Sequence, residues 1–153
     1  LSLNCDVIAQ HVDSDMPQVA AQEQGKFGVG YNTDMTPSAP DGHLTAPIWH
    51  WSSVYTAQVK DRIEGNWTPV NYFLGLAENM VDISPLSKNV AEGTAEAVEA
   101  ARAKILSGEW DVFTGPIYNN AGELVVAEGV ALEDSDITGN LMTTLLVKGV
   151  EVK

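Results

Sequence analysis

Five polar side chains directly follow two short apolar runs in the first quarter of the chain. The runs cover residues 6–10 and 27–31, and the first is apolar on both faces, as in a strand buried in a parallel sheet. Ligands gather at the carboxyl ends of such strands. Imidazole, carboxylate and amide groups there can donate and accept hydrogen bonds toward a heterocycle. The sequence therefore predicts a polar binding crevice formed by His11, Asp13, Ser14, Asn32 and Asp34.

Each of these polar residues also has a local structural interpretation. On its residues alone, His11 is better explained as a structural histidine that makes one local hydrogen bond. Asp13 and Ser14 suit the start of a helix, and capping is the better interpretation for Ser14. Asn32 and Asp34 are ordinary turn-forming residues, so a turn explains them as well as a ligand does.

A second candidate feature is the Trp49-His50-Trp51 sequence. A flat heterocycle stacks well on an aromatic face, and such stacking contributes about 1–3 kcal/mol per base. The alternative is structural, because alternate residues of a strand share one face and both tryptophans could lie in the core. Trp67 and Tyr72 are expected to be packing residues. The Gly28–Gly30 segment lacks the third glycine and the helix start of a dinucleotide-binding loop.

The residues give no support for catalysis or for a metal or cofactor. The three histidines lack the i, i+4 spacing of a helical zinc motif, and no Gly-x-Ser-x-Gly elbow occurs. Cys5 is the single cysteine, which excludes an internal disulfide and a cysteine-based metal site. We expect Cys5 to be a small buried residue. The sequence therefore predicts no catalytic residue, no metal site and no cofactor.

The excess of acidic over basic residues disfavours anionic partners. The 153 residues include 21 acidic and 8 basic ones, and the formal net charge is −13. This balance argues against nucleic acid and against an anionic membrane surface as partners. Solubility or an extracytoplasmic setting explains the acidity more simply. No apolar run approaches the roughly 18 residues needed to cross a bilayer.

The hydrophobic pattern predicts an α/β fold built on a parallel sheet. The loop over residues 32–42 contains two prolines and Gly42 and should be irregular. Residues 71–83 read as two short strand-like pieces. The expected strands cover residues 5–10, 27–31, 44–49 and 143–147, the expected helices 17–24, 52–64 and 90–106, and the expected hairpin 118–126.

Two of the predicted helices carry an apolar face. Over residues 52–64 this face repeats every four residues, at Tyr55, Val59 and Ile63. Over residues 90–106 it should point inward and is formed by Ala91, Ala95, Val98, Ala101 and Ile105.

Four motifs occur in a fixed order along the chain. They are CDVIAQHVDS at 5–14, GVGYNTDM at 28–35, HLTAPIWHW at 43–51 and FTGPIY at 113–118. In this order and spacing the chain resembles the basic membrane protein (BMP) family, the substrate-binding proteins of ABC importers that bind purines or nucleosides. The resemblance covers nearly the whole chain from Cys5 onward. It implies a type I periplasmic binding protein with two α/β lobes that close on the ligand.

The resemblance also implies a domain organisation, because members of the family are about twice as long. This chain would then be the C-terminal portion, with the N-terminal lobe and the first β-α unit of the second lobe preceding Leu1. About residues 1–110 would form the ligand-binding lobe, and about 111–153 a segment crossing back toward the first lobe. The full-length protein would be a periplasmic or extracytoplasmic lipoprotein, held at the membrane only by a lipid anchor and partnered by the membrane permease.

For the site, the resemblance implies a purine base or nucleoside as ligand. It favours Trp51 as the cleft-facing tryptophan, and it leads us to expect, in nucleoside-binding relatives, an acidic residue at position 32 and a lysine near position 49 that serve the ribose. Asn32 and Trp49 stand there instead, so a free, adenine-like base is favoured. Two alternatives remain: a cytoplasmic ligand-sensing regulator on the same fold and, third, an α/β nucleoside-processing enzyme. The predicted ligand-binding residues are His11, Asp13, Asn32, Asp34, Trp49 and Trp51.

Overall fold

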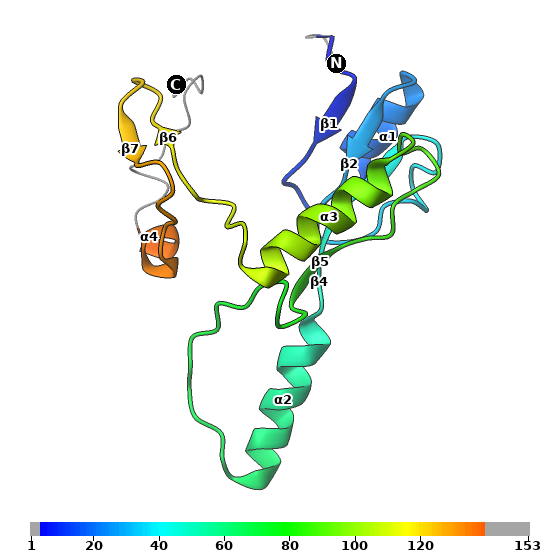
Figure 1. Cartoon of the computed structure of the whole chain (residues 1–153). Helices are drawn as coiled ribbons and strands as arrows, with labels where there is room; N and C mark the ends of the chain where they lie inside the picture. Colours follow the sequence, from blue (N-terminus) through cyan, green and yellow to red (C-terminus); the bar gives the residue numbers. More distant parts are fainter. Residues whose placement is uncertain (1–3, 140–153) are drawn as a thin grey trace. The chain divides into compact units, whose positions relative to one another are not determined.

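A computed structural model describes residues 4–139 of the chain. The N-terminal part of the chain forms a parallel three-stranded sheet with the strand order β1-β2-β3. Helix α1 (Met16–Glu23) connects β1 to β2 (Figure 1). The helix packs against β1 and β2. This arrangement confirms the predicted α/β class with a parallel sheet. The strands are β1 (Val7–Ala9), β2 (Phe27–Val29) and β3 (His43–Thr45).

Helix α1 begins and ends close to the predicted positions. The N-cap residue is Asp15, which makes no side-chain capping hydrogen bond. Ser14 stands one residue earlier, and its hydroxyl accepts a hydrogen bond from the Met16 N–H at 3.3 Å. Pro17 lies in the first turn, where its missing N–H costs nothing. Gly25 follows the helix with φ of 63°, a left-handed conformation that glycine adopts without strain.

Strand β1 is more exposed than the sequence predicts. It pairs with β2 alone among residues 4–139, in the register Val7–Phe27 to Ala9–Val29. As an edge strand it leaves Val7 47% exposed, and Cys5 is exposed as well. The expectation that this strand is buried on both faces, with Cys5 as a small buried residue, is therefore wrong in the described part of the chain.

The third predicted strand, residues 44–49, is divided at Ala46. Before the break β3 pairs in parallel with β2, and after it β4 (Pro47–Trp49) pairs antiparallel with β5 (Val81–Ile83). Ser84 occupies both main-chain groups of Ala46: its Oγ accepts the Ala46 N–H at 3.0 Å, and its N–H donates to the Ala46 oxygen at 2.8 Å. The strand pairing is thus interrupted at Ala46, where the chain passes from the sheet of β2 and β3 to the pair of β4 and β5. Of the two strand-like pieces expected in 71–83, only the second forms a strand.

Helix α2 (Trp51–Glu64) ends at Gly65, which has φ of 77°. Its predicted apolar face is exposed: Tyr55, Val59 and Ile63 are 61, 60 and 81% exposed. The four-residue spacing identified the helix correctly. It did not determine what covers the apolar face, because burial depends on neighbouring elements rather than on the helix itself.

Helix α3 (Thr94–Ser107) starts four residues later than the predicted start at residue 90. Val98, Ala101 and Ile105 are half-buried, as expected, whereas Ala91 and Ala95 are exposed. Gly108 follows with φ of 73°, in agreement with the predicted end.

The chain divides into two compact units, residues 1–98 and 99–153. The second contains the predicted hairpin, formed by β6 (Ile117–Tyr118) and β7 (Leu124–Val126), followed by α4 (Asp134–Gly139). The predicted strand at 143–147 lies outside the described residues, and the role of residues 111–153 as a crossing segment stays a prediction. Within residues 4–139, no helix combines the length and the apolar character that crossing a bilayer demands.

Candidate ligand-binding site

Two neighbouring hollows lie at the strand ends of the first unit, and they share Tyr31 and Asn32. The first, here called the aromatic hollow, has a volume of about 560 Å³. The second, called the acidic hollow, has a volume of about 360 Å³. The aromatic hollow is lined by Tyr31, Asn32, Trp49, Trp51, Val54, Tyr72, Phe73, Leu74, Met80 and Val81. The acidic hollow is lined by Asp13, Ser14, Asp15, Tyr31, Asn32, Thr33, Asp34, Met35, Pro37 and Ser38.

Asn32 connects the two hollows through its side-chain amide. Its Nδ2 donates a hydrogen bond to Oδ1 of Asp13, and its Oδ1 accepts one from the indole N–H of Trp49. Asn32 has φ of 66°, a left-handed conformation that asparagine tolerates better than most residues. A parallel bridge to Ile48 also places it beside β4. The structure thus brings together three predicted site residues from three separate segments.

Tyr31 is a lining residue that the sequence analysis did not select. Its ring is packed edge-on by His11, with centroids 4.4 Å apart and planes at 84°, and by Trp49, at 6.2 Å and 83°. His11 lines neither hollow, and it contacts the lining residue Tyr31 through this ring pair. Tyr31 could have been predicted from its position, because it ends an apolar run immediately before the predicted site residue Asn32.

Trp49 and Trp51 both line the aromatic hollow, but from different elements. Trp49 ends β4, and Trp51 begins α2. The argument that alternation along one strand puts both on one face is therefore wrong. Trp49 is half-buried and hydrogen-bonded to Asn32, whereas Trp51 is 49% exposed and stacks on Tyr55 with centroids 5.8 Å apart.

Tyr72 and Phe73 complete the aromatic lining from the segment that follows α2. They are 47 and 59% exposed, and the Tyr72 hydroxyl accepts a hydrogen bond from Nε2 of Gln58. Trp67 donates to Oε1 of the same glutamine at 2.6 Å and lines a different groove along α2. Tyr72, for which packing was the expected role, lines the aromatic hollow, whereas Trp67 does not.

Asp34 is held at the rim of the acidic hollow by Thr36. Its Oδ1 accepts hydrogen bonds from the Thr36 N–H at 2.9 Å and the Thr36 hydroxyl at 2.6 Å. These bonds to the charged form, the hydroxyl contributing most, hold the pKa of Asp34 below its usual value. The side chain is 44% exposed. At neutral pH the site therefore presents an ionised, accessible carboxylate.

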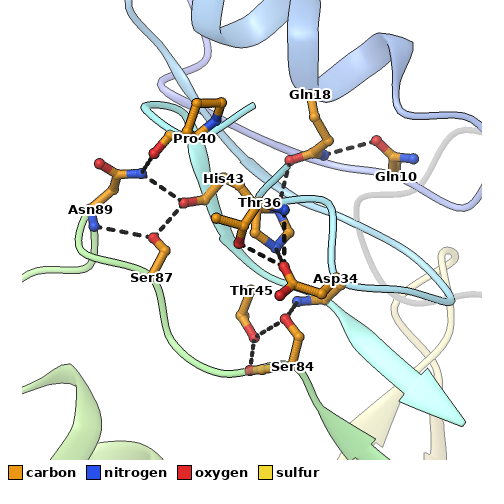
Figure 2. A network of polar contacts seen from close by, with 11 residues as sticks. Gln10, Gln18, Asp34, Thr36, Pro40, His43, Thr45, Ser84, Ser87 and Asn89 are labelled. Atoms are coloured by element: carbon orange, nitrogen blue, oxygen red, sulfur yellow. Dashed lines mark hydrogen bonds and ion pairs between the residues drawn. The ribbon is translucent and has the colours of Figure 1, made fainter. Parts of the chain in front are cut away.

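Asp34, which lines the acidic hollow, contacts a buried polar network (Figure 2). Gln18 and His43 are fully buried, and Gln18 hydrogen-bonds Gln10 at 2.8 Å. Glycines in and after β2 make room for both: a Cβ on Gly28 would lie 2.2 Å from Oε1 of Gln18, and one on Gly30 3.1 Å from Cε1 of His43. The Gly-Val-Gly sequence thus serves this network rather than a dinucleotide.

The electrostatics of the hollows are one-sided. Asp13, Asp15 and Asp34 contribute carboxylates, and neither hollow has a lysine or arginine among its described lining residues. Such a site disfavours phosphate and favours a neutral ring that donates hydrogen bonds. Over residues 4–139, no group of three or more His, Cys, Asp or Glu side chains is arranged to hold a metal ion.

Comparison with known proteins identifies similar sequences and folds. The family model described as PnrA-like ABC transporter substrate-binding protein matches residues 2–114. The chain is 32% identical over 134 residues to a purine-binding protein of Brucella abortus. It is 29% identical over 119 residues to a Haloferax volcanii protein whose assignment as an ABC transporter glucose-binding protein is provisional.

These matches cover most of this chain but a minor part of each relative. The aligned segments include 88 and 78% of this chain, and 38 and 30% of the two relatives. A solved structure, of a transcriptional activator of the comK gene from Bacillus halodurans, superposes with a TM-score of 0.61 at 23% identity. It covers 72% of this chain and 40% of that one. At this identity the likeness concerns the fold alone.

Proposed function

This chain belongs to the PnrA-like family of ABC transporter substrate-binding proteins, and from that premise we propose that it carries one side of a purine-binding cleft. The full-length protein captures a purine base between two lobes and delivers it to a membrane permease in an extracytoplasmic compartment. Adenine-like bases are favoured over nucleosides. A hinge that closes the lobes gives the form that the permease recognises.

The observation that carries this proposal is the aromatic hollow with the Asn32 amide at its edge. Tyr31, Trp51, Tyr72 and Phe73 offer faces or edges to a flat ring. Asn32 uses one amide hydrogen on Asp13 and one lone pair on Trp49, so a second hydrogen and a second lone pair remain. A donor and an acceptor side by side match the edge of a purine base.

The acidic hollow accounts for the choice of a base over a nucleotide. A carboxylate such as Asp34 accepts a hydrogen bond from an exocyclic amine or a ring N–H, whereas it repels a phosphate. The absence of a cation among the described lining residues of both hollows further disfavours an anionic ligand. The printed description of the Brucella relative as purine-binding supports the same class.

Calorimetry on the full-length protein tests the proposal with adenine, guanine, adenosine, glucose and a branched-chain amino acid. We expect the tightest binding for a purine base, with adenosine weaker than adenine. Tightest binding of glucose or of the amino acid would overturn the purine assignment. Binding of adenosine above adenine would retain the purine class and overturn the preference for a free base.

A further inference from the structure

The buried His43 ring faces two different polar neighbours. Its Nδ1 lies 3.3 Å from Oε1 of Gln18, and its Nε2 lies 3.4 Å from Oδ1 of Asp34 (Figure 2). The side chain is fully buried, and Nε2 makes no hydrogen bond to any described residue. Buried polar atoms without a partner are uncommon, so this nitrogen calls for an explanation.

The hydrogen-bond directions in the network determine which nitrogen of His43 carries the hydrogen. Gln10 Nε2 donates to the main-chain oxygens of Val12 and Ser14, at 3.0 and 2.6 Å. Gln10 Oε1 therefore faces Gln18 as an acceptor, and Gln18 Nε2 donates to it at 2.8 Å. Gln18 Oε1 is left as an acceptor toward His43, so Nδ1 must be the donor.

It follows that Nε2 of neutral His43 presents a lone pair to a carboxylate oxygen. Two acceptors at 3.4 Å do not attract each other, whereas a proton on Nε2 turns the same contact into an ion pair. Asp34 meets this nitrogen through Oδ1, the oxygen that also binds Thr36. No hydrogen bond within the described chain uses Oδ2, which remains available to a ligand.

The other groups packed around His43 are uncharged. Helix α1 contributes Gln18, and the segment after β5 contributes Ser87 and Asn89, which donate hydrogen bonds to the His43 main-chain oxygen. Lys88 in that segment is held 2.6 Å from Asp41 as an exposed ion pair. Asp34 is therefore the charged group that acts on the His43 ring.

We propose that His43 is a positioning residue for Asp34, and that a proton taken up between Nε2 and Oδ1 weakens the hold of Asp34 on a ligand. The step rests on the proposed function, because it assumes that Asp34 accepts a hydrogen bond from the ligand. In the protonated pair, the carboxylate charge is shared with the imidazolium, and a hydrogen bond to the ligand loses part of its charge assistance.

The expected pH dependence has a definite direction. Burial lowers the pKa of His43, and the nearby Asp34 carboxylate partly opposes this effect. The ring is therefore neutral at pH 7.5, where binding is strong, and gains its proton below the ordinary histidine pKa of about 6.5. By linkage, a ligand bound to Asp34 lowers the His43 pKa further.

A ligand-free NMR measurement tests the pair without relying on purine binding. Long-range ¹H–¹⁵N spectra of the full-length protein should show the Nδ1–H form of His43 at pH 7.5. Asp34→Asn should lower the pKa of His43, because the carboxylate that favours the charged ring is removed. An Nε2–H form in the wild type, or an unchanged His43 pKa in Asp34→Asn, would overturn the proposal.

Calorimetry with adenine at pH 7.5 and 5.0 tests the effect on the site. Wild type should lose affinity once the pH falls below the His43 pKa that the NMR titration measures, and His43→Gln should show no such loss. His50→Gln is the matched control: His50 hydrogen-bonds Asn79 at 3.0 Å and lines neither hollow, so this variant should behave as the wild type.

An equal loss of affinity in His43→Gln would overturn the proposal. If His43→Gln does not fold, the NMR comparison with Asp34→Asn decides it. If the wild type binds no adenine at either pH, the proposed function is wrong, and the NMR result still decides whether the His43–Asp34 proton site exists.

Discussion

The side-chain oxygen of Asn32 accepts the indole N–H of Trp49, which links the end of β2 to the end of β4. These two residues are 17 positions apart in the sequence. Their contact fixes the orientation of the tryptophan ring and, through the opposite side of the amide, that of Asp13. The edge shared by the two hollows is therefore held by one amide group.

This relationship predicts distinct effects of two substitutions at position 32. Asn32→Ala and Asn32→Gly should both weaken adenine binding, since both remove the amide. Asn32→Ala should also be less stable than Asn32→Gly by about 1 kcal/mol, because a Cβ at the observed φ of 66° is strained. Urea unfolding of the two variants measures the difference. Equal stabilities would mean that residue 32 is not left-handed in solution.

A second prediction concerns stacking by Trp51. Trp51→Ala should weaken adenine binding by about 1–3 kcal/mol without unfolding the protein. Trp67→Ala is the matched control, because Trp67 has a similar exposure, 45% against 49%, and lines a different groove. Calorimetry and thermal melting of both variants check this. A lowered melting temperature with unchanged affinity for Trp51→Ala would show a structural role.

A third prediction concerns the carboxylate of Asp34. Asp34→Asn should weaken adenine binding by about 1–3 kcal/mol if Oδ2 accepts a hydrogen bond from the base. Asp41→Asn removes a carboxylate that is ion-paired with Lys88 and lies outside both hollows, so its affinity should equal that of the wild type. Equal affinities for all three proteins would exclude Asp34 from recognition.

Stability should also depend on pH through His43. The pKa of its folded form is lowered by burial, so below about pH 6.5 the unfolded chain binds more protons than the folded one. The free energy of unfolding should therefore fall as the pH drops from 6.5 toward the folded pKa. Urea unfolding between pH 7.5 and 5.0 measures this, and His43→Gln should lack this part of the decrease.

Asp34 acts on stability in a lower pH window. Its folded pKa is held below the usual value by Thr36, so its stabilisation is complete above about pH 3.9 and is lost as the pH falls through the folded pKa. The pH windows of His43 and Asp34 are therefore separate. A free energy of unfolding that decreases only below pH 3.9 would show that His43 does not contribute.

The 153-residue chain by itself should bind no purine with useful affinity. Both hollows lie within one unit of the chain, and the aligned segments span 38 and 30% of the two relatives. A base stacked on one side remains half in water and lacks the desolvation that closure of a second lobe gives. Titration of adenine followed by tryptophan fluorescence is a direct test. Submicromolar saturation would show that the pocket is complete within this chain.

The sequence by itself determined the elements that depend on local patterns. The start of α1 with Pro17 in its first turn, the left-handed end of α2 at Gly65 and the hairpin over 117–126 follow from proline, glycine and turn chemistry, which act within a few residues. The motif order likewise identified the family, and strand-end logic led to Asp13, Asn32 and Asp34, which the structure places around one hollow.

Only the tertiary structure decided what depends on contacts between distant residues. The split at Ala46 requires Ser84, 38 positions away, and the stripe at Tyr55 is exposed because no described element covers it. His43 gives the clearest case. Its burial and its lone pair facing Asp34 follow from Gln10, Gln18 and two glycines brought together by the sheet. No spacing along the chain predicts such a network, because its contacts join residues from a strand, a helix and two loops.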